Sequence, residues 1–113
     1  MSGKPLLIMV AGPYSAPTAE ERTANLKAMN AAAADVIRRG HIPVVGVNAA
    51  LPVLEAACLP DSHPGMMEIS LALAARCDAV LQIGRSPGAD REAELARDQG
   101  RPVYTSLEQL PER

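Results

Sequence analysis

Aromatic residues are almost absent from this chain. It contains no tryptophan and no phenylalanine, and its two aromatic side chains are Tyr14 and Tyr104. Proteins that bind single-stranded nucleic acids usually stack bases on several rings. The formal net charge of −2 also lacks the basic excess that a phosphate backbone requires. We therefore expect no nucleic-acid polymer as a partner.

Long hydrophobic runs and disulfide-type cysteine patterns are missing as well. The apolar run at 6–11 is too short for a membrane span or a signal-peptide core, so we expect a cytoplasmic protein with no membrane partner. Cys58 and Cys77 have apolar neighbours and make no disulfide framework, so both are expected to be buried thiols. His41 and His63 show no ligand spacing with either cysteine. No metal and no cofactor are expected.

The residues that are present allow an aliphatic core. The chain has 113 residues, which suffices for one domain but not for two separate cores. About 48% of the residues are hydrophobic, so that single core can be substantial. We expect one domain that spans residues 1–113.

Short apolar runs alternate with longer helical stretches. Strands are expected at 6–11, 42–45, 79–83 and 102–104. Helices are expected at 18–39, 48–58 (interrupted by Pro52), 66–76 and 89–99, with a short last helix that Ser106 opens as part of a capping box. The proline- and glycine-containing segment 59–65 is expected to be a loop. The 66–76 segment is apolar on several sides, which suggests a subunit interface.

This alternation predicts an α/β fold with a doubly wound parallel sheet in the strand order 2-1-3-4. Ligands of such sheets bind outside the carboxyl ends of the strands, where the chain reverses direction. In this order the reversal lies between the first and third strands. The two loops at that point are 12–15 and 84–88, the most distinctive loops in the sequence.

Glu92 is the candidate catalytic residue. It lies in the expected first turn of the 89–99 helix, on the same side as the apolar Leu95 and Ala96. The other charged residues of this helix fall on the opposite side. The alternative is a first-turn glutamate that only interacts favourably with the helix dipole.

Ser86 and Gly88 precede that helix and are candidate ligand-binding residues. A glycine-containing turn at a helix N-terminus exposes N–H groups, which accept a phosphate or another anion. The alternative is an ordinary turn between strand and helix. The sequence carries neither a Walker loop nor the dinucleotide fingerprint.

Other polar residues have weaker claims to function. Tyr14 either lines the ligand pocket and orients Glu92 or packs over the first helix. Arg22 and Asn25, one turn apart, either reach the crevice or are solvated. His63 is interpreted as a surface residue, with a lid loop as the alternative. Asp78 is interpreted as structural.

An ordered set of short motifs runs through nearly the whole chain. The first half holds Ala11-Gly12-Pro13-Tyr14-Ser15, Arg22, Asn25 and Gly40-His41. The second half holds Cys77-Asp78-Ala79-Val80, Ser86-x-Gly88-Ala89-x-x-Glu92, Ala96 and Gly100-x-Pro102-Val103. Together they resemble the nucleoside 2-deoxyribosyltransferase-like family, in particular its small members with a Gly-Pro-Tyr first loop.

The resemblance implies a flavodoxin-like, Rossmann-like three-layer sandwich and cleavage of the N-glycosidic bond of 2'-deoxynucleosides or their monophosphates. It implies that Glu92 attacks C1', that Gly12 and Pro13 shape the first loop, and that Ser86 and Gly88 hold the 5' end. It also implies a metal-free, homo-oligomeric protein. Whether the sugar passes to water or to a second base is left open.

The chain departs from the family at one position. Active members carry an aspartate where this sequence has Ser70, with Glu68 two residues away. Serine cannot act as a general acid near neutral pH, although Ser70 is retained as a candidate substrate-binding residue. Two alternatives therefore stand beside the enzyme: a nucleotide-binding module without catalysis, and an oligomerising structural or interaction protein.

Overall fold

The computed structural model describes residues 3–59 and 63–112. Within them the strands are β1 (Leu7–Ala11), β2 (Ile42–Val44), β3 (Ala79–Gln82) and β4 (Val103–Tyr104). The helices are α1 (Ala19–Arg38), α2 (Gly46–Ala56), α3 (His63–Ala74) and α4 (Pro87–Asp98), followed by a short 3₁₀ helix, η1 (Leu107–Gln109). The predicted alternation of strands and helices is confirmed.

The four strands form one parallel sheet in the order β2-β1-β3-β4. In the central pair, Ile8 lies opposite Ala79 and Ala11 lies opposite Gln82. The predicted strand order and the doubly wound topology are therefore confirmed. Pro43 lies in the edge strand β2, where its missing N–H leaves no bond of the sheet unmade.

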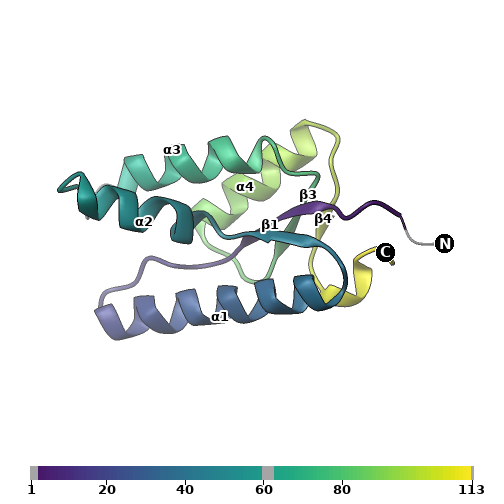
Figure 1. Ribbon diagram of the computed structural model, residues 1–113. Coiled ribbons are helices and arrows are strands. Elements are labelled where there is room, and N and C mark those ends of the chain that lie inside the picture. The colour runs from purple at the N-terminus through teal and green to yellow at the C-terminus, as the bar shows by residue number, and fades with distance from the viewer. Residues whose placement is uncertain (1–2, 60–62, 113) are drawn as a thin grey trace.

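Helices cover both faces of the sheet, which gives three layers (Figure 1). Alternate residues of β1 enter different cores because strand side chains point to opposite faces. Ile8 and Val10 pack with Met29 and Val36 of α1. Met9 and Ala11 pack on the other face, in the cluster that takes in residues of α3 and α4.

Helix α1 begins and ends near the predicted bounds of 18–39. Thr18 is its N-cap, and the Thr18 side chain accepts a hydrogen bond of 3.1 Å from the Glu21 N–H. Gly40 follows the helix with a φ of 88°, which glycine adopts without strain. The helix also carries acidic residues in its first turn and a basic residue in its last, as its dipole favours.

Helix α4 begins two residues before its predicted start at 89. Ser86 is the N-cap and accepts from the Ala89 N–H at 3.0 Å, and Pro87 occupies the first helical position, for which its fixed φ is suited. The predicted tight loop therefore ends at Ser86. Glu92 consequently lies in the second turn rather than in the first.

The α2–α3 region differs most from prediction. Helix α2 spans Gly46–Ala56 with Pro52 inside it, and α3 begins at His63, so the predicted loop at 59–65 is helical from residue 63 onward. Its remaining residues 60–62 lie outside the described part. Helix α3 packs against both α2 and α4, which accounts for apolar residues on more than one of its sides.

Two local predictions are wrong. Cys77 is buried as expected, and burial raises the pKa of its thiol to about 11, but Cys58 is exposed after the end of α2. Ser106 precedes η1 without donating or accepting a side-chain capping bond. The Gln109 side chain instead accepts from the Thr105 N–H at 2.7 Å, so half of the capping box forms one residue earlier.

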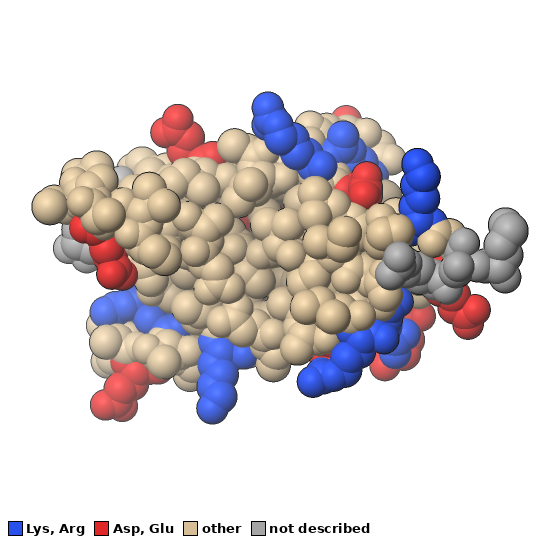
Figure 2. All heavy atoms as spheres, viewed as in Figure 1, with Lys and Arg blue, Asp and Glu red and all other residues tan. Residues whose placement is uncertain are grey.

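Several large hydrophobic side chains remain exposed, and they come from the end of α1, the start of β2, α2 and the segments that follow α2 and β3: Ile37, Ile42, Val53, Leu59 and Ile83. In the view of Figure 2, charged side chains gather around the periphery, and the middle of the visible face holds few of them. None of the helices described here combines the length and hydropathy needed to cross a bilayer.

Candidate active site

The loops after β1 and β3 touch, as the strand order predicts. A methyl group built on Gly12 would lie 2.8 Å from the Ile83 side chain, and one built on Gly84 would lie 2.9 Å from Pro13. Both glycines are therefore needed for the close approach of the two loops. Gly12 and Pro13 both lie at this junction.

A cavity of about 200 Å³ lies beside this junction. The first loop, α2, α3 and α4 all contribute to its wall. Its lining residues are Gly12, Tyr14, Ser15, Val47, Met66, Met67, Ser70, Ser86, Pro87, Gly88, Ala89 and Glu92. Typical small-molecule sites occupy roughly 300–1,000 Å³, so this cavity encloses part of such a ligand and leaves the rest near the exposed rim at Ser15 and Pro87.

Glu92 is the acidic residue of this wall. It is only 8% exposed, and its Oε2 atom has no hydrogen-bond partner in the described structure. Burial raises the pKa of the Glu92 carboxyl from 4.5 to about 8. The predicted inward orientation is confirmed, since Ala93 and Ala96 beside it are buried as well.

The N-terminus of α4 does not lower the pKa of Glu92. The helix dipole acts mainly within the first turn, and α4 begins early enough to put Glu92 beyond it. Desolvation by burial therefore determines the direction in which the pKa of Glu92 shifts. At neutral pH the isolated chain holds this carboxyl mostly in its protonated form.

Ser86 and Gly88, the predicted ligand-binding residues, lie in the cavity wall, and ligand contact by either one stays a prediction. The Ser86 Oγ atom accepts from the Ala89 N–H, so its own hydroxyl hydrogen is free to donate. Gly88 packs closely on α3, because a methyl group built on it would lie 3.1 Å from the Met67 sulfur.

Tyr14 combines both of its alternative interpretations. Its ring packs on the core cluster beneath α1 and also lines the cavity that contains Glu92. No hydrogen bond joins the Tyr14 hydroxyl to Glu92 among the described residues, so its orienting role stays a prediction.

Arg22 and Asn25 hold the first loop rather than line the cavity. The Arg22 guanidinium donates to the Ala16 carbonyl at 2.8 Å, and the Asn25 amide donates to the Tyr14 carbonyl at 3.0 Å. These bonds fix the backbone that carries Tyr14. Both residues thus support the site from behind, and direct ligand contact by either one stays a prediction.

Ser70 lines the cavity and is 4% exposed, whereas Glu68 on the same helix is exposed and outside the wall. The helix register therefore does not let Glu68 replace the missing aspartate. Gly46 at the start of α2 lies directly against the Ser70 side chain. Position 46 therefore has no room for a side chain.

Sequence reasoning missed the apolar part of the wall, formed by Val47, Met66 and Met67. Val47 lies near the start of α2, outside the predicted bounds of 48–58, and Met66 and Met67 lie within α3, at the start of the helix predicted at 66–76. A signal existed in the paired methionines, because flexible thioether side chains often line binding surfaces.

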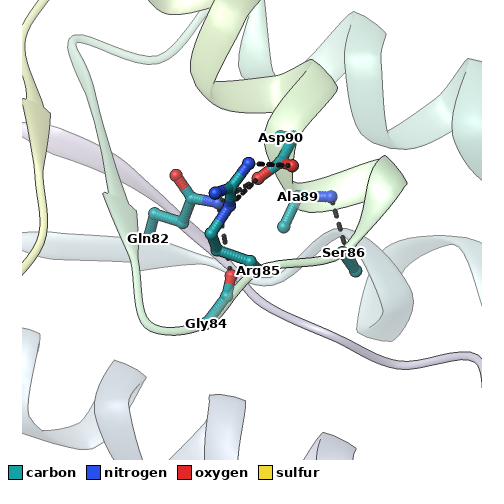
Figure 3. A network of polar contacts seen from close by, with 6 residues as sticks. All are labelled: Gln82, Gly84, Arg85, Ser86, Ala89 and Asp90. Carbon is teal, nitrogen blue, oxygen red and sulfur yellow. Dashed lines mark hydrogen bonds and ion pairs between the residues drawn. The ribbon is translucent and has the colours of Figure 1, made fainter.

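A second, wider groove of about 870 Å³ lies on the opposite side of α4, and Glu92 does not line it. Asp90 links this groove to the loop after β3 (Figure 3). It accepts from Gln82 at 2.8 Å and pairs with Arg85 at 3.1 Å, and the bonds from Arg85 and then Gln82 lower the pKa of the Asp90 carboxyl. This network fastens the loop to the start of α4.

Among the described residues, no cluster of three or more histidine, cysteine, aspartate or glutamate side chains is arranged to hold a metal ion. No model of a known protein family matches the chain, and its comparison with curated proteins gives no match either. The chemistry of the cavity must therefore be argued from its own residues.

Proposed function

We propose that this protein cleaves the N-glycosidic bond of a 2'-deoxynucleoside or its monophosphate, with Glu92 as the nucleophile. The observation that carries the proposal is the buried Glu92 carboxyl, whose Oε2 lacks a partner and which lies in the wall of a mostly apolar cavity. Unpartnered buried polar groups are rare in proteins, and ionisable groups with strongly shifted pKa values cluster at functional sites.

The position of the cavity supports the same conclusion. It lies at the point where a doubly wound sheet reverses its strand order, which is the common ligand site of such folds. The resemblance of the motifs to nucleoside 2-deoxyribosyltransferase-like proteins supports it independently, since Tyr14, Ser86, Gly88 and Glu92 all line this one cavity.

In the proposed reaction the ionised Glu92 carboxylate attacks C1' of the sugar. The C1'–N bond breaks, and its electron pair leaves with the base, which takes a proton from solvent. Water, or a second base, then attacks C1' and releases the carboxylate, while the proton of the attacking group passes to solvent. This divides one difficult displacement into two easier steps.

Each neighbouring group has a part in this scheme. The Tyr14 hydroxyl donates to the carboxylate and favours its ionised form. Ser86 and Gly88 bind the 5' end of the sugar. Ser70, the hydroxyl group on α3, binds the ligand without taking part in proton transfer.

The test is release of free base from the four 2'-deoxynucleosides and their 5'-monophosphates, with and without an acceptor base. Wild type and Glu92→Gln are compared, because glutamine keeps the size of the side chain but cannot form the ester. Release by wild type alone supports the proposal. Equal release by both proteins excludes Glu92 as the nucleophile.

A nucleotide-binding module without catalysis is the second candidate. It is favoured by the raised pKa of Glu92, which keeps the carboxyl mostly protonated, and by Ser70 in place of an acid. In that case ligand binding persists in calorimetry while no base is released from any member of the panel.

We further propose that the chain self-associates in the cytoplasm. Val53, an exposed hydrophobic residue of α2, is a candidate contact for an interface, and an exposed free cysteine such as Cys58 suits a reducing compartment. Val53→Glu leaves the core intact because that side chain is 59% exposed. Sedimentation of this variant as a smaller species than wild type supports self-association through α2, and an unchanged mass rejects it.

A further inference from the structure

The start of α4 has unusually few groups available for an anion. A helix N-terminus normally binds phosphate through several free N–H groups in its first turn. Here Pro87 occupies the first position and has no N–H, and the Ala89 N–H is already bound to Ser86 Oγ at 3.0 Å. The Asp90 N–H makes the first regular i→i−4 bond of the helix, to the Ser86 carbonyl at 2.8 Å, as in any α-helix. The Gly88 N–H is the first-turn donor that remains.

The rest of the cavity wall offers no compensating positive charge. None of its described lining residues is lysine, arginine or histidine. Arg22 of α1 and Arg85 of the loop after β3 are engaged elsewhere, since Arg22 donates to the Ala16 carbonyl and Arg85 pairs with Asp90 at the other groove. A phosphate dianion in the cavity would also face the Glu92 carboxyl, and burying an unpaired charge is costly.

The same groups suit a neutral hydroxyl. The Ser86 hydroxyl can donate one hydrogen bond and the Gly88 N–H a second, which satisfies the acceptor capacity of one oxygen. Met66, Met67 and Val47 supply apolar surface for the rest of the molecule.

We propose that Pro87 and the Ser86 cap make this cavity selective for an uncharged 2'-deoxynucleoside over its 5'-monophosphate. The inference deepens the proposed function and rests on it for the identity of the ligand. Pro87 is the specificity-determining residue, because it removes the N–H that a phosphate oxygen would otherwise bind.

The experiment is a chemical-shift titration with matched pairs of 2'-deoxynucleosides and their 5'-monophosphates, alongside measurement of base release from each. Wild type is expected to bind the nucleoside of a pair about tenfold or more tightly than the monophosphate. The amide signals of Ser86 and Gly88 should shift with the nucleoside.

Pro87→Ala restores an N–H at the first helical position and keeps a good helix former there. Pro87→Ala is expected to lower the ratio of nucleoside affinity to monophosphate affinity by about threefold or more, because it binds the monophosphate more tightly. Ser86→Ala, which frees the Ala89 N–H, should shift the preference in the same direction. Pro52→Ala, an exposed proline in α2, is the matched control and should leave the ratio unchanged.

Each outcome decides the inference. Equal or tighter binding of the monophosphate by wild type overturns it, and an unchanged ratio in Pro87→Ala removes Pro87 as its cause. Base release without any preference for the nucleoside preserves the proposed function but rejects this selectivity. Selective binding of the nucleoside without base release supports the selectivity but rejects the proposed glycosidic cleavage. Binding of neither the nucleoside nor the monophosphate rejects both proposals.

Discussion

Gly46 lies so close to Ser70 that a methyl group on the glycine would collide with the serine hydroxyl. This contact joins the first residue of α2 to the middle of α3 at the wall of the cavity. The backbone approach between the two helices therefore requires both a glycine and a small partner.

Gly46→Ala is expected to lower the free energy of unfolding by about 1–3 kcal/mol, the usual effect of overpacking. The higher helix propensity of alanine, worth up to about 1 kcal/mol, opposes this loss without cancelling it. Urea unfolding measures the difference. Combining Gly46→Ala with Ser70→Gly should recover most of the loss, and strictly additive effects in this double-mutant cycle would refute the contact.

Glu92→Gln is expected to stabilise the protein at high pH. The folded-state pKa of about 8 exceeds the usual value of 4.5, so the folded protein binds the extra proton between these values. The free energy of unfolding of wild type therefore falls as pH rises from about 4.5 to 8, by up to roughly 5 kcal/mol. Above this range the loss is complete.

Urea unfolding between pH 5 and pH 9 tests this slope. In the Glu92→Gln variant, the free energy of unfolding should fall less steeply with pH than in wild type, because the contribution of Glu92 is missing. Glu94→Gln, an exposed residue of the same helix, is the control and should keep the wild-type profile. Parallel profiles for wild type and Glu92→Gln would show that Glu92 titrates normally.

Base release is expected to depend on pH with the opposite sign. The nucleophile is the ionised form, so kcat/KM of wild type should rise with pH to a plateau above about 8, reflecting the free-enzyme pKa of Glu92. A profile that falls through this range would instead assign the protonated carboxyl a role as general acid. Initial rates on one nucleoside at fixed ionic strength decide between the two.

Tyr14→Phe tests the hydroxyl that lines the cavity beside Glu92. A hydrogen bond to a charged group is worth about 1.5–3 kcal/mol, so its loss should lower kcat by about tenfold or more. The midpoint of the pH profile should also move to higher pH, because the ionised carboxylate loses a donor. Tyr104→Phe, the other tyrosine, is the matched control; identical effects of both substitutions would point to a general packing defect.

The sequence predicted the sheet and the position of the site because both depend on local patterns. Apolar runs such as 79–83 and the Ser86 cap are encoded in neighbouring residues, and strand order then brings the two loops together. The apolar wall from Val47, Met66 and Met67 depends on how α2 and α3 pack, which no local pattern specifies. The raised pKa of Glu92 could not be predicted from local patterns either, since burial is a property of the folded chain.

Cys58 is expected to be a site where glycine stabilises the fold. It follows the α2 C-cap with a φ of 60°, a conformation that costs most residues about 1–2 kcal/mol. The N–H groups of Cys58 and Leu59 bond to the Glu55 and Leu54 carbonyls at 3.0 and 2.7 Å, the Schellman pattern that glycine usually completes.

Cys58→Gly should therefore raise the free energy of unfolding by about 0.5–1 kcal/mol, since the gain in the folded state outweighs the greater freedom of glycine in the unfolded chain. Gly100→Ala is the reciprocal control: its φ is 72° and nothing crowds its side-chain position, so its loss of stability isolates the backbone effect. Cys58→Ala separates removal of the thiol from relief of strain. Stabilisation by alanine as large as that by glycine would contradict the strain at this position.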